Sequence, residues 1–410
     1  MASGEILAAA WIAPISSPLM RDAAVAFSDG RITALGPIKE IRSQHPDFVF
    51  RDLGSVIILP GLINAHTHLE LSTCCCGDQA PERFSDWILS LPQRHTMDAE
   101  TLARLNIESV RAGIEQSLRY GVTCVGDISQ FSQFSRSVLA DSPLRAVSYA
   151  EALGLGSRRM RFEMRLEEIH TGALDEDRIT LGISPHAPYT VDLPGYRQCL
   201  EKSREERMSL ATHLSEWPDE AEFLRGRTGM FRELYDRLGF NLDGVETFPD
   251  TPIQFAHAIG LLQHPSLLAH VNYCNDDELA LLAAGRSSVV YCPRTHRYFG
   301  HGPHRWREML AAGINVAIGT DSCASSPDLN LVDDLRLLHE IAPEVSPETI
   351  WQLATINGAR ALQRSDIGSL SFGNYADLVA FPVASDRPLG ELLENSAMPT
   401  QLWIAGQPIH

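Results

Sequence analysis

The chain has 410 residues, of which 44% are hydrophobic and 21% charged, a composition typical of globular proteins with a large core. A formal charge of −18 at pH 7 argues against nucleic acid and anionic membrane surfaces as partners. The longest apolar run, residues 6–15, is too short to span a bilayer, and no Lys or Arg precedes it as in a signal peptide. We therefore expect a cytoplasmic protein.

The elements predicted first along the chain are a hairpin and then a long series of strands. Residues 23–34 predict a hairpin that turns at Asp29-Gly30. Beyond it, short apolar runs rich in Val, Ile, Leu, Ala or Thr alternate with amphipathic stretches, as buried parallel strands alternate with helices. These runs are residues 56–65, 121–128, 145–152, 179–184, 210–214, 267–271, 288–292 and 315–319. They predict an α/β fold with a (β/α)8 barrel.

The C-terminal end of the chain returns to strand-like patterns. Residues 376–383 and 401–410 have the composition of strands, with a turn at Gly406. Short strands at both chain ends, with a barrel between them, predict one small β-sandwich domain built from both termini. We place this composite β domain at residues 1–57 and 365–410, and the barrel at residues 58–364.

Polar side chains follow several predicted barrel strands, at the end where the loops of such barrels carry chemistry. His66 and His68 end the first strand, and a period of two puts both on one face. His213 ends the fifth strand, His270 the sixth and Asp321 the eighth. Each alone is more simply a buried structural residue, but two same-face histidines would be costly without a partner. Three or four imidazoles with a carboxylate suit Zn²⁺ or Fe²⁺, with room for a water.

In order along the chain, these segments resemble the amidohydrolase superfamily, and within it the branch of cytosine, guanine and adenosine-type deaminases and chlorohydrolases. The resemblance covers nearly the whole chain. Its segments are residues 60–68 (PGLINAHTH), 184–190 (SPHAPYT), 213–216 (HLSE), 268–270 (LAH), 319–322 (GTDS), 355–362 (TINGARAL), 368–370 (GSL) and 374–379 (NYADLV). Any one segment is moderate evidence, whereas the ordered set is strong.

The resemblance implies a role for each matching residue. The metal ligands would be His66, His68, His213 and Asp321. Glu216 would shuttle protons, His270 would orient the metal water and the substrate, and His186 would hydrogen-bond the substrate. Residue patterns alone do not separate ligand from neighbour for His270, and they leave Glu216 open as an exposed carboxylate at a helix start.

The number and positions of the lysines indicate how many metal ions the predicted site would hold. The chain has only two lysines, Lys39 and Lys202. Relatives with two metals bridge them through a carbamylated lysine at the end of the fourth barrel strand, and neither lysine here reaches that position. The resemblance therefore implies one divalent ion, with Zn²⁺ preferred to Fe²⁺.

The expected activity is hydrolytic deamination of an amino-substituted N-heterocycle, a C–N hydrolysis that releases ammonia. Glu216 can carry the proton of the attacking water to the ring nitrogen, and Asp321 can carry the next proton to the departing amine. The leading small-molecule substrates are adenosine-type nucleosides: S-adenosylhomocysteine, methylthioadenosine, 5′-deoxyadenosine or aminodeoxyfutalosine. Alternatives are guanine, cytosine, triazine or formimino substrates, and a non-catalytic scaffold, which the complete ligand set disfavours. A monomer and a homo-oligomer both stay open.

Substrate contacts are predicted from two further segments. Arg294 and His296 follow the seventh strand and could hold an anionic or hydroxyl-rich part of the substrate, although a solvated arginine fits the pattern equally well. Trp87, with Phe84 and Leu91, could cover an aromatic base or could be the core face of a helix.

Overall fold

The structure is a computed structural model that describes residues 4–92, 96–172 and 178–409. The chain divides into two compact units. The first comprises Met1–Ala65, Glu115–Val125 and Asn330–His410, and the second comprises His66–Ile114 and Gly126–Leu329. In the described ranges, no helix combines the length and the apolar character that crossing a bilayer requires.

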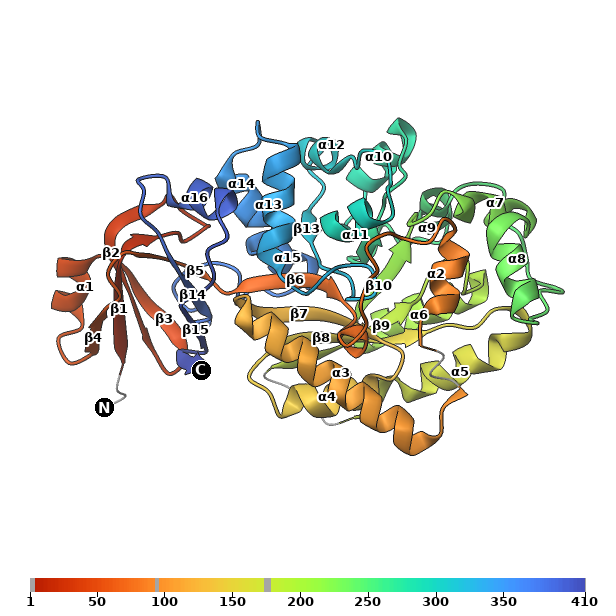
Figure 1. The fold of residues 1–410 in the computed structure, drawn as a ribbon, viewed down its shortest axis with the longest axis horizontal. Coiled ribbons are helices and arrows are strands. Elements are labelled where there is room, and N and C mark those ends of the chain that lie inside the picture. Colours follow the sequence, from red (N-terminus) through yellow and green to blue (C-terminus); the bar gives the residue numbers. More distant parts are fainter. Residues whose placement is uncertain (1–3, 93–95, 173–177, 410) are drawn as a thin grey trace. The chain divides into compact units, whose positions relative to one another are not determined.

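The first unit contains a mixed sheet in which strands from both chain ends pair, drawn in red and blue in Figure 1. The strand order is β16-β15-β14-β5-β1-β2-β3, and β4 pairs with β1. Because β5 and β14 pair antiparallel, the two ends of the chain share one hydrogen-bonded sheet, which confirms a β domain built from both termini. The strands are Glu5–Ile12 (β1), Met20–Ser28 (β2), Arg31–Pro37 (β3), Val49–Asp52 (β4), Val56–Pro60 (β5), Leu378–Pro382 (β14), Gln401–Ile404 (β15) and Gln407–Ile409 (β16).

Both faces of this sheet are buried, as the alternation of side chains along a strand explains. In β1, Leu7 belongs to a cluster that includes Trp403, whereas its neighbour Ile6 belongs to a second cluster with Ile41 of α1 (Ile38–Gln44). The predicted hairpin is present between β2 and β3, where Asp29 (φ 52°) and Gly30 (φ 74°) both adopt the left-handed backbone of a two-residue turn.

A second sheet of eight strands, β6 to β13 in sequence order, forms a nearly closed parallel barrel and confirms the predicted α/β fold. Closure is marked by a parallel bridge between Thr67, at the end of β6, and Asp321, after β13. The strands are Leu62–Thr67 (β6), Val122–Ser129 (β7), Arg145–Ala152 (β8), Ile179–Pro185 (β9), Ser209–Leu214 (β10), Leu267–His270 (β11), Ser288–Tyr291 (β12) and Val316–Ile318 (β13).

Helices follow most of these strands, as the amphipathic stretches predicted. Asn275 caps α10 (Asp276–Ala283) with a reciprocal pair of hydrogen bonds to Glu278, the residue three positions on. The other α-helices of the described residues are Phe84–Ser90 (α2), Ala99–Arg119 (α3), Ser132–Ala140 (α4), Arg159–Glu167 (α5), Leu193–Glu206 (α6), Asp219–Gly226 (α7), Gly229–Arg237 (α8), Pro252–Ala258 (α9), Pro293–Tyr298 (α11), Trp306–Ala311 (α12), Leu331–Ile341 (α13), Pro347–Leu353 (α14), Ile356–Ala361 (α15) and Pro388–Glu394 (α16).

The apolar run 56–65, predicted as a single strand, forms two strands in the structure. Its first half is β5 of the mixed sheet, and its second half is β6 of the barrel. The break falls at Gly61, where a Cβ atom would lie 2.2 Å from the hydroxyl of Thr123. A run of buried apolar residues does not reveal such a change of sheet, because both strands are buried along their whole length.

Candidate metal and active site

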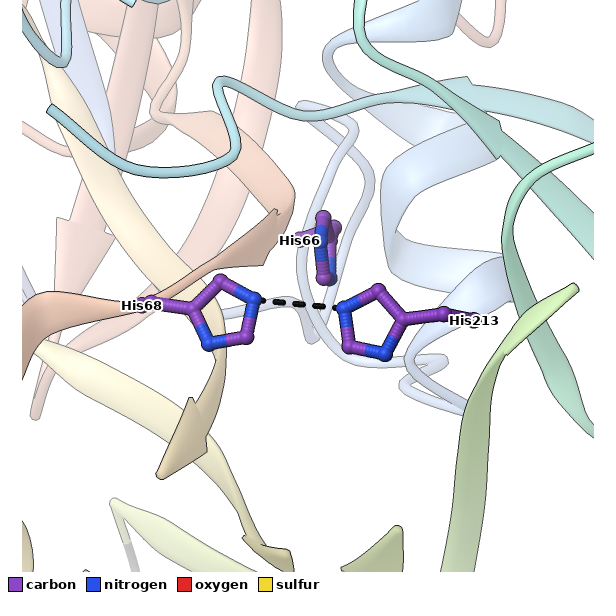
Figure 2. Close-up of side chains that lie close together, drawn as sticks. All are labelled: His66, His68 and His213. Carbon is purple, nitrogen blue, oxygen red and sulfur yellow. Dashed lines mark hydrogen bonds between the residues drawn. The ribbon is translucent and has the colours of Figure 1, made fainter. Parts of the chain in front are cut away.

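Three histidine side chains meet at the ends of two barrel strands, as Figure 2 shows. His66 and His68 come from the end of β6, and His213 comes from β10. One nitrogen from each ring lies within 4.8 Å of the others, an arrangement that could hold a metal ion. The Nε2 atoms of His68 and His213 are only 3.2 Å apart.

The protonation of these rings shows why a cation fits between them. Nδ1 of His213 donates to the carbonyl oxygen of His186 at 3.0 Å, and His68 bonds the main chain of Ile128. Burial lowers the pKa of His68 to about 4 and that of His213 well below its usual value, so both rings are neutral at neutral pH. Their Nε2 lone pairs therefore face each other. Ligand nitrogens of a tetrahedral Zn²⁺ are about 3.3 Å apart, so this spacing suits the ion.

Asp321 brings a carboxylate to the same group. Its Oδ1 lies 3.7 Å from Nε2 of His66 and 3.7 Å from Nε2 of His68, while its Oδ2 accepts from the hydroxyl of Ser325 at 2.9 Å. The main chain fixes this approach, because the amide of Asp321 donates to the carbonyl of His66. Gly319 permits it, since a Cβ atom there would lie 2.5 Å from the same carbonyl oxygen.

Glu216 lies beside the histidines with its carboxyl group buried. Its Oε2 accepts from the hydroxyl of Tyr189 at 3.2 Å, and its Oε1 is 3.6 Å from Nε2 of His270. Burial, and next the charge of Asp321, raise the pKa of Glu216 well above its usual value. Glu216 can therefore hold a proton at neutral pH, as a residue that transfers protons must.

The turn that carries Glu216 is held by a second glutamate. The carboxylate of Glu220 accepts from the amides of Ser215 (3.2 Å), Glu216 (2.6 Å) and Trp217 (3.0 Å). Ser215 has a positive φ of 52°, as do His270 (71°) and Asp321 (55°). Left-handed backbone is uncommon for residues other than glycine, and it concentrates at functional sites.

A cavity of about 280 Å³ opens onto His68, His213, Glu216, His270 and Asp321. Part of its lining is apolar, with side chains from α2, α8 and the loops around them: Phe84, Trp87, Leu155, Tyr189, Leu234 and Phe240. Another part is polar and comes from the ends of β7, β8 and β9, from the residue before α5 and from α5 itself: Gln130, Glu151, Arg158, Arg161 and His186. The cavity can therefore hold a molecule with one apolar and one polar part.

Most residues singled out from the sequence meet at this cavity. His186 lines it, and so does Trp87, whose indole nitrogen donates to the carbonyl of Ala324 and whose ring stacks on Phe84. The metal-ligand candidates, Glu216 and His270 are all within the cluster described above. Their catalytic, binding and ligand roles stay predictions, since the geometry shows proximity and not chemistry.

The structure does not bring Arg294 and His296 to the cavity. The guanidinium of Arg294 binds Asp328 instead, at 2.7 Å to its carboxylate and 2.9 Å to its carbonyl oxygen. His296 packs against Tyr291 and the His301 and His304 rings. The cationic side chains that line the cavity are Arg158 and Arg161.

Several residues at the site had no counterpart in the sequence-based predictions. Tyr189 falls inside the motif of residues 184–190, so its position could have indicated it. Glu151 is the penultimate residue of the third apolar run, and a polar side chain near a strand end is the same signal that identified the histidines. Glu220 gave no comparable signal, because an acidic residue in the first turn of a helix is common on protein surfaces.

Comparison with known proteins places this site in a family. The chain matches the amidohydrolase family over residues 57–409. It is 29% identical over 381 residues to a 5-methylthioadenosine/S-adenosylhomocysteine deaminase of Moorella thermoacetica, covering 90% of this chain and 83% of that protein. It is 29% identical over 348 residues to an aminodeoxyfutalosine deaminase of Deinococcus radiodurans, covering 81% and 79%. The crystal structure of an adenosine deaminase from Xanthomonas campestris with bound zinc superposes with a TM-score of 0.83 at 25% identity, covering 99% and 92%.

Proposed function

Because the chain belongs to the amidohydrolase family, and the deaminases compared above hydrolyse C–N bonds, we propose that it is a zinc-dependent deaminase of an adenosine-type nucleoside. One observation carries the proposal. The Nε2 atoms of His68 and His213 lie 3.2 Å apart with their lone pairs toward each other, and the carboxyl groups of Asp321 and Glu216 line the same cavity. The similarity to proteins named as deaminases of this substrate class supports it.

The residues present fit one divalent ion. His66, His68, His213 and Asp321 would hold it, which matches the neutral nitrogens and single carboxylate that zinc accepts. The zinc in the similar adenosine deaminase supports this choice of metal. Such an ion, when bound, lowers the pKa of a coordinated water enough to supply hydroxide near neutral pH.

The side chains around the ion account for the proton transfers of deamination. Water adds to the ring carbon that bears the amine, and this requires a proton on the adjacent ring nitrogen. Glu216 would carry that proton, because it lies in the cavity and its raised pKa lets it hold one. Asp321 would accept the second proton of the water and pass it to the amine, which leaves as ammonia. The Nε2 of His270 has no hydrogen-bond partner among the described residues, so it is available to the water or the substrate.

The lining of the cavity favours a nucleoside over a free base. Trp87, which packs on the buried Phe84 ring, offers an aromatic surface to a planar ring, while Glu151, Gln130 and His186 offer polar groups that a base alone would not occupy. Arg158 and Arg161 could pair with a carboxylate on the 5′ group, as S-adenosylhomocysteine and aminodeoxyfutalosine carry. Methylthioadenosine and 5′-deoxyadenosine would use the apolar lining instead.

Ammonia release and metal content, measured on one preparation, test the proposal. The panel contains adenosine, 5′-deoxyadenosine, methylthioadenosine, S-adenosylhomocysteine and aminodeoxyfutalosine, with guanine and cytosine as alternatives. We expect one zinc ion per chain and deamination of at least one nucleoside. A metal-replete protein that deaminates guanine or cytosine and none of the nucleosides would overturn the proposed substrate class.

A further inference from the structure

A buried carboxyl oxygen without a partner faces the cavity beside the metal-ligand candidates. Glu151, at the end of β8, is only 3% exposed and lines the cavity. Its Oε1 atom makes no hydrogen bond to any of the described residues. A buried oxygen in this state is costly unless something occupies the space in front of it. The mechanism proposed above does not use Glu151.

His186 presents an acceptor next to this oxygen. Its Nδ1 is 2.7 Å from the hydroxyl of Thr190, which itself donates to the carbonyl of Ala187. The hydroxyl therefore accepts from Nδ1, and Nε2 is left with its lone pair. Nε2 lies 3.9 Å from Oε1 of Glu151.

This spacing fits one hydroxyl group. An oxygen at ordinary hydrogen-bond distance from both atoms would make an angle of about 90° between them, close to the directions of an O–H bond and a lone pair. We propose that Glu151 and His186 together bind one sugar hydroxyl of the substrate, which donates to Nε2 of His186 and bonds Oε1 of Glu151. The proposal rests on the nucleoside substrate proposed above.

Neighbouring side chains hold Glu151 in place for this contact. Gln130 hydrogen-bonds Glu151, and the oxygen of the Gln130 amide accepts from Arg161 at 2.8 Å. Glu70 in turn accepts from the main-chain amide of Gln130 at 3.1 Å. Burial, and next the charge of Glu70, raise the pKa of Glu151 to about 8, so its carboxyl group can donate at neutral pH. A hydroxyl has a single proton, which it gives to Nε2 of His186, so it is the protonated carboxyl group of Glu151 that donates from Oε1 to the hydroxyl oxygen.

A second metal ion is a less suitable occupant. Glu151, His186 and His213 lie close enough to be considered a metal-binding group. However, Nδ1 of His213 donates to a carbonyl, and its Nε2 faces Nε2 of His68. His213 therefore has no nitrogen left for another ion, whereas a hydroxyl needs only Glu151 and His186.

The test compares a substrate with its 2′-deoxy and 3′-deoxy analogues on four proteins. These are the wild type, Glu151→Met, Glu151→Gln and the exposed control Glu167→Gln. In the wild type, removal of one hydroxyl should lower kcat/KM by about 10- to 100-fold, because buried partners lose their bond. The ratio to compare is kcat/KM for the substrate divided by kcat/KM for its deoxy analogue. Glu151→Met should reduce this ratio to within about threefold of one. Glu151→Gln, which can still bond a hydroxyl, should retain most of the ratio, and Glu167→Gln should retain all of it.

Zinc content and thermal unfolding of each variant separate recognition from damage to the fold. Both deoxy ratios near one in the wild type would overturn the inference and leave the deaminase proposal intact. An unchanged ratio in a folded, zinc-loaded Glu151→Met protein would also overturn it. If Glu151→Met does not fold, Glu151→Ala takes its place: a ratio reduced to within about threefold, with an unchanged ratio in Glu167→Gln, supports the assignment, and a ratio equal to wild type refutes it. A wild type that deaminates no nucleoside overturns both proposals.

Discussion

Replacement of Glu216 by glutamine isolates the proton transfer from the rest of the site. Glutamine has nearly the same shape, and its oxygen can still accept from Tyr189, which bonds Oε2 of Glu216 at 3.2 Å. The main-chain bonds from Glu220 that hold this turn are unaffected. The variant cannot carry the proton that the buried carboxyl group holds. We therefore expect kcat to fall by about 10²- to 10⁴-fold, or about 2.7–5.4 kcal/mol in activation free energy.

Steady-state deamination kinetics with zinc analysis on the same sample would check this expectation. The metal content should stay at the wild-type value, because the ligand candidates, which include His213 and Asp321, are unchanged. Glu222→Gln, on helix α7 shortly after Glu216 and outside the cavity lining, is the matched control and should keep normal turnover. A Glu216→Gln protein with full zinc and turnover within about threefold of wild type would refute the reasoning.

Three further predictions concern the metal, an ion pair and pH. The His213→Ala variant should lose zinc, and its unfolding temperature, measured by calorimetry, should fall to that of the chelator-treated wild type. A variant that keeps stoichiometric zinc would contradict the ligand assignment. Arg294→Ala should remove the ion pair with Asp328, destabilise the fold by about 1–3 kcal/mol and change kcat/KM equally for charged and neutral substrates. A loss of kcat/KM confined to charged substrates would show instead that Arg294 contacts the substrate. Because burial raises the pKa of Glu151 to about 8, its contribution to stability is fully present below about pH 4.3 and is lost as the pH rises to 8. Denaturant titrations of wild type and Glu151→Gln should therefore show the variant gaining relative stability over that range, and a pH-independent difference would count against the raised pKa.

The positions of the candidate ligands could be predicted because parallel strands fix where their ends meet. His66, His68, His213 and Asp321 each follow an apolar run, and the barrel brings the carboxyl ends of all its strands to one end. Local pattern was therefore enough to predict which side chains gather. The tautomers that leave the Nε2 lone pairs facing each other were not predictable, because they depend on main-chain carbonyls contributed by other strands.

The contacts of Arg294 could not be predicted from the local sequence pattern. Its place after the seventh apolar run suggested that it faces the substrate, yet α11 begins at Pro293 and the side chain binds Asp328, 34 positions later. A pairing between a helix residue and a distant loop residue depends on the path of the chain between them and not on strand periodicity. For the same reason, the position of Arg161 at the cavity could not be predicted from the sequence. Arg161 reaches the cavity from the helix after β8 and donates to Gln130, which lies in the loop after β7.

The left-handed backbone at Ser215, His270 and Asp321 links the site to the energy of the whole fold. A glycine would adopt each conformation without strain, but a glycine at His270 or Asp321 would remove the side chain that the site needs. At about 1–2 kcal/mol for each residue, the three together cost roughly 3–6 kcal/mol. A domain has only about 5–15 kcal/mol of net stability, so strain of this size is comparable with the margin that keeps the protein folded. Substitutions that stabilise this protein most readily are therefore expected at these turns, and they would be the ones that selection for activity rejects.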